Sequence, residues 1–223
     1  MHFAPTYFDV GFEEMLLSEQ DGPGRWDDDY HRDLMKLGLV DRNDMEDQRP
    51  EYRKNASEDY WETSGALPSN LPEEHHSTTW IANHVVAELN QWGNSGNMMM
   101  VGFVKPHHPF DPPQRWIDKY NPEELSILPG WIEEPLQRDL AVAPGYFPHK
   151  ELTEKKLRRA MANYYASISQ IDFHVGRMID VLKKNELYEN TMIIFTSDHG
   201  EHLGYHHQLL KGGYMYDSMP KFR

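Results

Sequence analysis

The sequence predicts an α/β fold, in which helices cover a mainly parallel sheet. Three observations support this prediction. An apolar run lies at 98–104, a long amphipathic pattern covers 153–184, and a β-branched and aromatic run follows at 191–196. A helix that connects two buried strands is typical of proteins with helices layered on a sheet.

The clearest helix is expected from Thr153 to about Lys184. Its apolar residues recur in steps of three and four, which places them on one face: Leu157, Met161, Tyr164, Ile168, Ile171, Val175, Met178 and Leu182. Thr153 is a suitable N-cap, and lysines end the segment at the negative end of the helix dipole. A second helix is expected within 75–92, opened by Ser77-Thr-Thr79.

The two apolar runs are expected to form strands. Residues 98–104 (Met-Met-Met-Val-Gly-Phe-Val) are bounded by turn residues and follow the predicted helix. Such a continuous run is typical of a parallel strand that is buried on both faces. Residues 191–196 (Thr-Met-Ile-Ile-Phe-Thr) end abruptly in Ser-Asp-His-Gly. Both strands therefore deliver polar residues to the carboxyl edge of one sheet.

The remaining sequence divides into two parts. Residues 1–70 are polar, with acidic clusters, and we expect an irregular excursion over the core. Residues 75–223 are expected to form the α/β core portion of the same domain. Within it, the proline-rich stretch 106–148 predicts a long loop region anchored by Trp116 and Trp131.

The composition excludes several function classes. Lys plus Arg is 22 and Asp plus Glu is 36, so the net charge is 22 − 36 = −14. Nucleic-acid binding is not expected, because affinity for phosphate backbones comes from clustered cations. The chain has 0 cysteines, which excludes disulfides, cysteine-ligated zinc and thiol catalysis. No apolar run is long enough to span a membrane, and Met1-His-Phe-Ala-Pro5 does not resemble an export signal.

Asp198 and His199 are the first candidate site. A carboxylate and an imidazole at a strand end can bind a divalent cation, with Ca²⁺ or Mg²⁺ favoured by the carboxylate and Zn²⁺ or Mn²⁺ also suited to the histidine. Lys211, in a Lys-Gly-Gly turn, would place a positive charge against an anion. The competing interpretation is a helix or turn cap beside a hydrogen-bonded histidine.

The loop Lys105-Pro-His-His-Pro-Phe110 follows the other predicted strand. Its prolines stiffen it, so His107 can be held against an anionic ester oxygen; alone, the motif would equally suit a structural turn. His2 is a further candidate, although a terminal histidine is usually solvated. His202 and His206 would share a face only if they lay on a helix.

These motifs resemble the formylglycine-dependent sulfatases of the alkaline phosphatase superfamily. The resemblance is strongest from Asn163 to Tyr216, which includes Ser-Asp-His-Gly, and it extends to Lys105-Pro-His-His-Pro-Phe. It implies a three-layer sandwich around a mainly parallel sheet, of which this chain is a partial catalytic domain.

The resemblance also implies roles for single residues. Asp198 and His199 would bind one Ca²⁺, and Lys211 and His107 would contact the sulfate group. His2 would partner the hydroxyl of the nucleophile. The family's paired aspartates and its Cys- or Ser-x-Pro-x-Arg segment are absent, so the sequence is expected to be an internal or truncated fragment with little or no turnover of its own.

The predicted function is therefore hydrolysis of a sulfuric ester, with a divalent cation and a formylglycine nucleophile outside this chain. The substrate would be a small-molecule or carbohydrate sulfate ester. The alternatives are a phosphodiester or phosphonate monoester hydrolase of the same superfamily, an inactive metal- or anion-binding remnant, and a histidine-rich buffer of transition metals. The family resemblance favours a periplasmic, extracellular or lysosomal location.

Overall fold

The computed structural model describes residues 9–19, 27–48, 50–94, 96–142, 147–212 and 216. Within these residues all regular secondary structure is helical. The α-helices are α1 (Asp29–Lys36), α2 (Arg42–Gln48), α3 (Pro50–Arg53), α4 (Glu58–Glu62), α5 (Ser77–Leu89), α6 (Gln114–Ile117), α7 (Gln137–Val142) and α8 (Glu154–Lys184). Single 3₁₀ turns are η1 (Glu73–His75), η2 (Pro122–Glu124), η3 (His149–Glu151) and η4 (Tyr188–Asn190).

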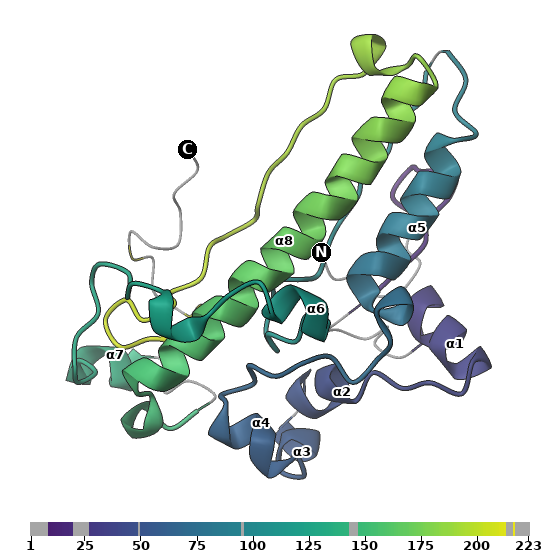
Figure 1. Cartoon of the computed structure of the whole chain (residues 1–223). Helices are drawn as coiled ribbons and strands as arrows, with labels where there is room; N and C mark the ends of the chain where they lie inside the picture. The colour runs from purple at the N-terminus through teal and green to yellow at the C-terminus, as the bar shows by residue number, and fades with distance from the viewer. Residues whose placement is uncertain are drawn as a thin grey trace.

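The long helix α8 runs through the molecule, and α5 packs along it (Figure 1). The helix predicted at 153–184 is confirmed, and the Thr153 side chain caps it by accepting a hydrogen bond from the backbone N–H of Lys156. The helix predicted within 75–92 is confirmed as α5, which is capped by the ring of His76. In the described residues no helix is both long and apolar enough to cross a membrane.

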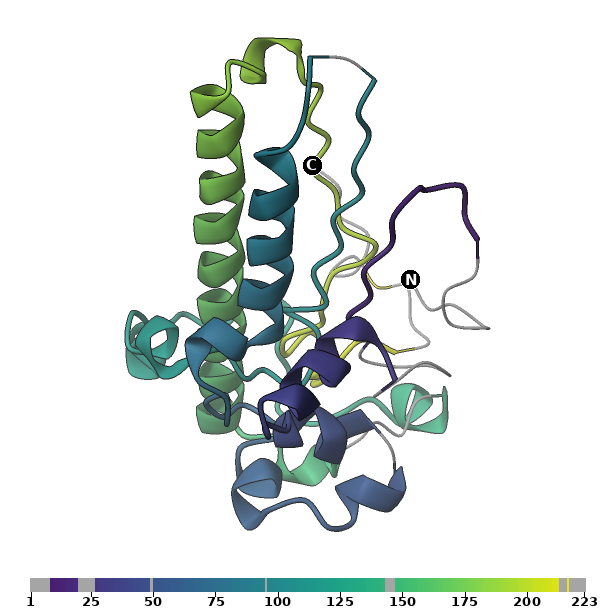
Figure 2. The same cartoon turned by 90° about the vertical axis from the view of Figure 1, so that its right-hand side faces the viewer.

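The two predicted strands are extended segments that lie on the same side of the α5–α8 pair (Figure 2). Neither forms a strand ladder within the described residues, so the parallel sheet is not confirmed. The expectation that both are buried is wrong for this chain: Met98 is 78% exposed and Ile194 is 79% exposed. Met99 and Phe103 of the first segment pack against the apolar cluster between α5 and α8, whereas residues 192–195 of the second segment are all exposed.

The N-terminal part contains more regular structure than its sequence indicates. Four short helices, α1 to α4, occur where an irregular excursion is expected. Tyr30 and Leu34 of α1 pack against Leu71 and Trp80, and polar side chains add hydrogen bonds to the rest of the protein. Tyr30 of α1 donates a hydrogen bond to the carbonyl of His75, and Asn43 of α2 donates one to Asp111.

Two apolar clusters fix the ends of α8. Near its N-terminal end Leu157 and Met161 pack against Phe110 and Leu203, which brings the 105–110 loop and the 199–211 segment to the same end of the helix. At the far end, Met178 and Leu182 pack against α5. Burial of each such side chain contributes about 1.5–3 kcal/mol. The core thus gathers the chemically interesting loops at one end of the molecule.

Candidate active site

A cavity of about 290 Å³ lies at the end of the molecule where these loops meet. His107 lines it from the 105–110 loop, and Lys211 lines it from the segment that follows residue 199. The wall also contains Ser64, His108, Phe147, His149 and Glu201. Two of the residues that the sequence analysis singles out, far apart in the chain, therefore face one space.

His107 is oriented by its own loop. Its Nδ1 lies 2.7 Å from the carbonyl oxygen of His108, so Nδ1 carries the proton and Nε2 is left for a ligand in the cavity. Burial, and next the charge of Lys211, lower the pKa of His107 to about 4. The ring is therefore neutral near pH 7 until an anion stabilises its charged form.

Asp198, His199 and Lys211 form a chain of contacts beside the cavity. Nδ1 of His199 lies 2.8 Å from the carbonyl oxygen of Gly200, which leaves a lone pair on Nε2. The Nζ of Lys211 lies 3.0 Å from that Nε2, so the ammonium donates to it. Asp198 Oδ2 lies 3.5 Å from the same Nε2. The carboxylate side chain of Asp198 is 84% exposed and reaches into solvent.

The pair formed by Asp198 and His199 fits part of a cation site. A carboxylate oxygen and an unprotonated imidazole nitrogen at 3.5 Å are close enough to share one ion. The present partner of His199 Nε2 is itself a cation, the ammonium of Lys211. Since divalent cations take four or more ligands, these two residues supply only part of a coordination shell.

The remaining sequence candidates are placed differently. His2 lies outside the described residues. His202 and His206 do not lie on a helix: residues 203–207 form turns, and His206 has a positive φ of 51°. Their spacing of four residues therefore does not place the two side chains on one helical face.

Glu201 is a cavity residue that the sequence analysis missed. It is half-buried, and desolvation raises its pKa to about 7, against the opposing effect of Lys211. Its position in the sequence, two residues after the Asp-His pair, could have indicated that Glu201 lies in the site. His149, at the start of η3 and just after the loop region predicted at 106–148, also lines the cavity although its sequence surroundings give no indication of this.

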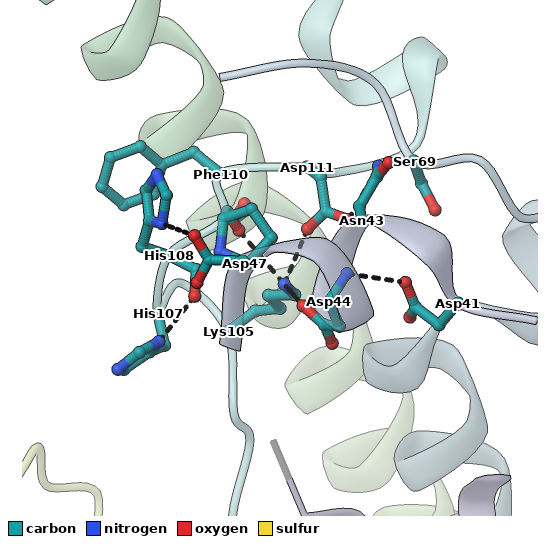
Figure 3. Close-up of polar contacts among 12 residues, drawn as sticks. Asp41, Asn43, Asp44, Asp47, Ser69, Lys105, His107, His108, Phe110 and Asp111 are labelled. Atoms are coloured by element: carbon teal, nitrogen blue, oxygen red, sulfur yellow. Dashed lines mark hydrogen bonds and ion pairs between the residues drawn. The ribbon is translucent and has the colours of Figure 1, made fainter. Parts of the chain in front are cut away.

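The base of the 105–110 loop carries a buried charge network that the sequence analysis also missed (Figure 3). Lys105 Nζ lies 2.9 Å from Asp44 Oδ1, 2.6 Å from Asp111 Oδ1 and 3.1 Å from the carbonyl oxygen of Pro109. An ammonium has three N–H donors, so these partners satisfy it. Burial lowers the pKa of Lys105, but Asp111 and Asp44 outweigh it and raise the pKa above its usual range.

Three carboxylates in this network, Asp41, Asp44 and Asp111, offer oxygens within 4.8 Å of one another. The ammonium of Lys105 contacts two of them, Asp44 and Asp111. Burial and the charge of Asp44 raise the pKa of Asp41 to about 6, and burial raises the pKa of Asp111 well above its usual range. The negative charge of the triad is therefore reduced in two ways: by the nearby ammonium of Lys105 and by the raised pKa values of Asp41 and Asp111.

The sequence model of the sulfatase family matches residues 28–221. The chain belongs to the sulfatase family. The match includes the cavity residues His107 and Lys211 and both metal-site candidates, so the sulfatase resemblance seen in the motifs is confirmed at the level of family. The family model by itself assigns no role to any of these side chains.

Curated relatives of this sulfatase-family chain have several described activities. An arylsulfatase of Clostridium perfringens is 33% identical over 152 residues, which cover 65% of this chain and 31% of the relative. A multifunctional alkaline phosphatase superfamily protein of Trinickia caryophylli is 30% identical over 206 residues, or 82% of this chain and 39% of the relative. The sulfatase-family chain thus spans about a third of the length of such relatives.

Solved structures place this sulfatase-family chain in the fold of alkaline-phosphatase-like hydrolases. The phosphonate monoester hydrolase of Agrobacterium radiobacter has a TM-score of 0.64 at 22% identity, covering 96% of this chain and 46% of that one. The enzyme from Silicibacter pomeroyi has a TM-score of 0.58 at 24% identity, covering 75% and 38%. The likeness supports part of the predicted fold, although the sheet itself is not formed by the described residues.

Proposed function

We propose that this chain supplies part of the active site of a sulfuric ester hydrolase. The observation that carries the proposal is the shared cavity of His107 and Lys211, with Lys211 also in contact with His199. A sulfate monoester is an anion, and a cavity lined by an ammonium and a histidine suits it despite the net charge of −14. The reaction is R–O–SO₃⁻ plus water giving the alcohol and hydrogen sulfate.

Each cavity residue has a definite chemical task in this proposal. The Lys211 ammonium binds a sulfate oxygen and offsets charge that develops as the ester bond breaks. His107, whose low pKa keeps it neutral near pH 7, takes up a proton when the anion binds, because the anion raises its pKa. Its Nε2 then donates a hydrogen bond to a sulfate oxygen or to the leaving alcohol.

The metal and the nucleophile complete the proposal. One Ca²⁺ held by Asp198 and His199, with further ligands from outside these 223 residues, would polarise the ester oxygens. The nucleophile, a formylglycine, would also come from sequence beyond this chain, and His2 would act on its hydroxyl. In agreement with this, the chain has 0 cysteines and covers only 31% to 39% of the two curated relatives.

A phosphonate monoester or phosphodiester hydrolase is the alternative function. The solved structures with the same fold are phosphonate monoester hydrolases, and one curated relative is described as multifunctional. The same ammonium and imidazole suit a phosphorus-centred monoanion. Turnover of an aryl sulfate and an aryl phosphodiester by a polypeptide that also contains the nucleophile would separate the two; the 223-residue chain alone is expected to turn over neither, as an inactive remnant would.

Anion binding tests the proposal in this chain itself. Titration of inorganic sulfate by calorimetry should show binding that Lys211→Ala weakens by about ten- to a hundredfold, the effect of a lost charge-assisted hydrogen bond of about 1.5–3 kcal/mol. The matched control is Lys36→Ala, which removes the same charge from an exposed position on α1. Equal sulfate affinity in Lys211→Ala and wild type would refute the proposed role of this cavity.

The proposed partner is a small-molecule or carbohydrate sulfate ester, in keeping with relatives described as choline-sulfatase and iduronate 2-sulfatase. A periplasmic, extracellular or lysosomal location remains part of the proposal, as does the absence of nucleic-acid binding.

A further inference from the structure

The cavity-facing His107 belongs to a loop whose neighbouring residues are fixed by a different part of the chain. His108 points away from the cavity side chain of His107 and into the protein (Figure 3). Its Nδ1 lies 2.6 Å from Oδ1 of Asp47 on α2, and its Nε2 lies 3.0 Å from the carbonyl oxygen of Ser64. The ring is therefore held at both nitrogens, by the carboxylate of Asp47 at Nδ1 and by a hydrogen bond to the Ser64 carbonyl at Nε2.

The surroundings of this pair leave it little freedom. The side chains of His108 and Asp47 are 2% and 1% exposed. Tyr60 donates a hydrogen bond of 2.5 Å to Asp47 Oδ1, and the rings of Phe110 and Phe147 lie 5.0 and 5.4 Å from that of His108. A buried ion pair with this geometry holds its partners firmly, because breaking it leaves a charge without compensation in a medium of low polarity.

A second buried contact holds the two ends of the loop. The ammonium of Lys105, at the start of the loop, binds the carbonyl of Pro109 and the carboxylate of Asp111 at its end, and it also binds Asp44 of α2. Helix α2 therefore supplies one carboxylate, Asp44, to the base of the loop and another, Asp47, to its middle. The two residues lie three positions apart, on the same face of the helix.

The buried contacts of His108 affect His107 through one backbone group, the carbonyl of His108. The oxygen of His108 lies 2.7 Å from His107 Nδ1, so the position of the His108 backbone decides which nitrogen of His107 carries the proton. We propose that Asp47 of α2 is a positioning residue for His107, acting through its ion pair with buried His108, while Lys105 and Asp44 fix the ends of the loop. The inference rests on the proposed role of His107 in the anion site.

The test uses the 223-residue chain with ¹⁵N-labelled histidine rings and inorganic sulfate as the probe. In Asp47→Asn we expect the His107 ring to lose its single tautomer, with Nδ1 no longer always protonated, and sulfate affinity to fall by about tenfold or more. The control is Asp28→Asn, since Asp28 forms an equally buried pair with His31 at 2.7 Å in α1. It should reduce stability while leaving the His107 signals and sulfate affinity unchanged.

The outcomes separate this inference from the proposed function. Wild-type tautomer and sulfate affinity in folded Asp47→Asn would overturn the positioning role and leave the sulfate site intact. If the wild-type chain does not bind sulfate, the proposed function is refuted. The tautomer of the His107 ring in Asp47→Asn, measured without sulfate, would still decide the positioning role. If Asp47→Asn does not fold, Tyr60→Phe decides instead: it removes only the hydroxyl that holds Asp47 and should shift the His107 tautomer in the same direction.

Discussion

The ammonium of Lys211 lies 3.0 Å from the unprotonated Nε2 of His199. A lysine that would bind an anion thus contacts a histidine that would bind a metal. A cation at His199 would compete with the ammonium for the same lone pair, and Lys211 would then be directed to an anion in the cavity. Metal and anion sites in this chain are therefore expected to be coupled.

Calcium binding is expected to depend on Asp198 and not on the buried triad. Asp198→Asn should abolish the Ca²⁺-induced shift of the His199 ring signals, whereas Asp41→Asn should leave it unchanged, because the ammonium of Lys105 already binds two of the three triad carboxylates. With two protein ligands, wild-type binding should not saturate below about 1 mM. NMR titration of the His199 ring signals of the three proteins with CaCl₂ measures this, and loss of the shift in Asp41→Asn alone would assign the cation to the triad.

The pKa of His107 should respond to Lys211. Burial is the main cause of its low pKa of about 4, and the charge of Lys211 is the next. Lys211→Met removes that charge and should raise the pKa of His107, measured from ring proton shifts between pH 3 and 8. Lys183→Met, at the far end of α8, is the control and should leave the titration unchanged. A lower pKa in Lys211→Met would contradict the observed arrangement.

Asp41→Asn should stabilise the protein at neutral pH. Because its pKa is raised to about 6 in the folded state, the contribution of Asp41 is full below its unfolded pKa of 3.8 and is lost as pH rises through about 6. Asparagine avoids this loss, its one carbonyl oxygen can still accept from the backbone N–H of Asp44 in α2, and Tyr30 keeps the carbonyl of His75 as an acceptor. Urea unfolding should show a gain on the order of 1–3 kcal/mol at pH 8 and little difference near pH 4. A less stable variant at pH 8 would mean that attraction to Lys105 exceeds the desolvation of the carboxylate.

Gly204→Ala should destabilise the segment that carries His199 and Lys211. Gly204 has a φ of +100°, and a Cβ there would meet Leu157 Cδ2 at 2.5 Å. We expect a loss of about 2 kcal/mol or more in urea unfolding. Gly176→Ala is the matched control: this helical glycine in α8 has nothing within 4 Å of a Cβ, so the change should stabilise by up to about 1 kcal/mol. Equal effects at the two positions would contradict the packing of residue 204 on α8.

The sequence by itself determined the two long helices and the order of the motifs. The apolar period of 153–184 and the cap at Thr153 are local properties, and they reappear unchanged in α8. The Asp-His-Gly and Pro-His-His-Pro motifs also indicated the family without coordinates. By contrast, the acidic stretch from Asp41 to Asp47 looked irregular, since its residues satisfy no apolar pattern.

Only the tertiary structure decided what those acidic residues do. Asp47 gains its partner His108, and Asp44 its partner Lys105, from a loop about 60 residues away. No local pattern encodes such a pairing, because a buried charge is stable only when the fold brings its counterion to it. The same holds for the apolar runs at 98–104 and 191–196. Their composition predicts burial, but burial depends on which other elements cover them, and the described residues leave Met98 and Ile194 78% and 79% exposed.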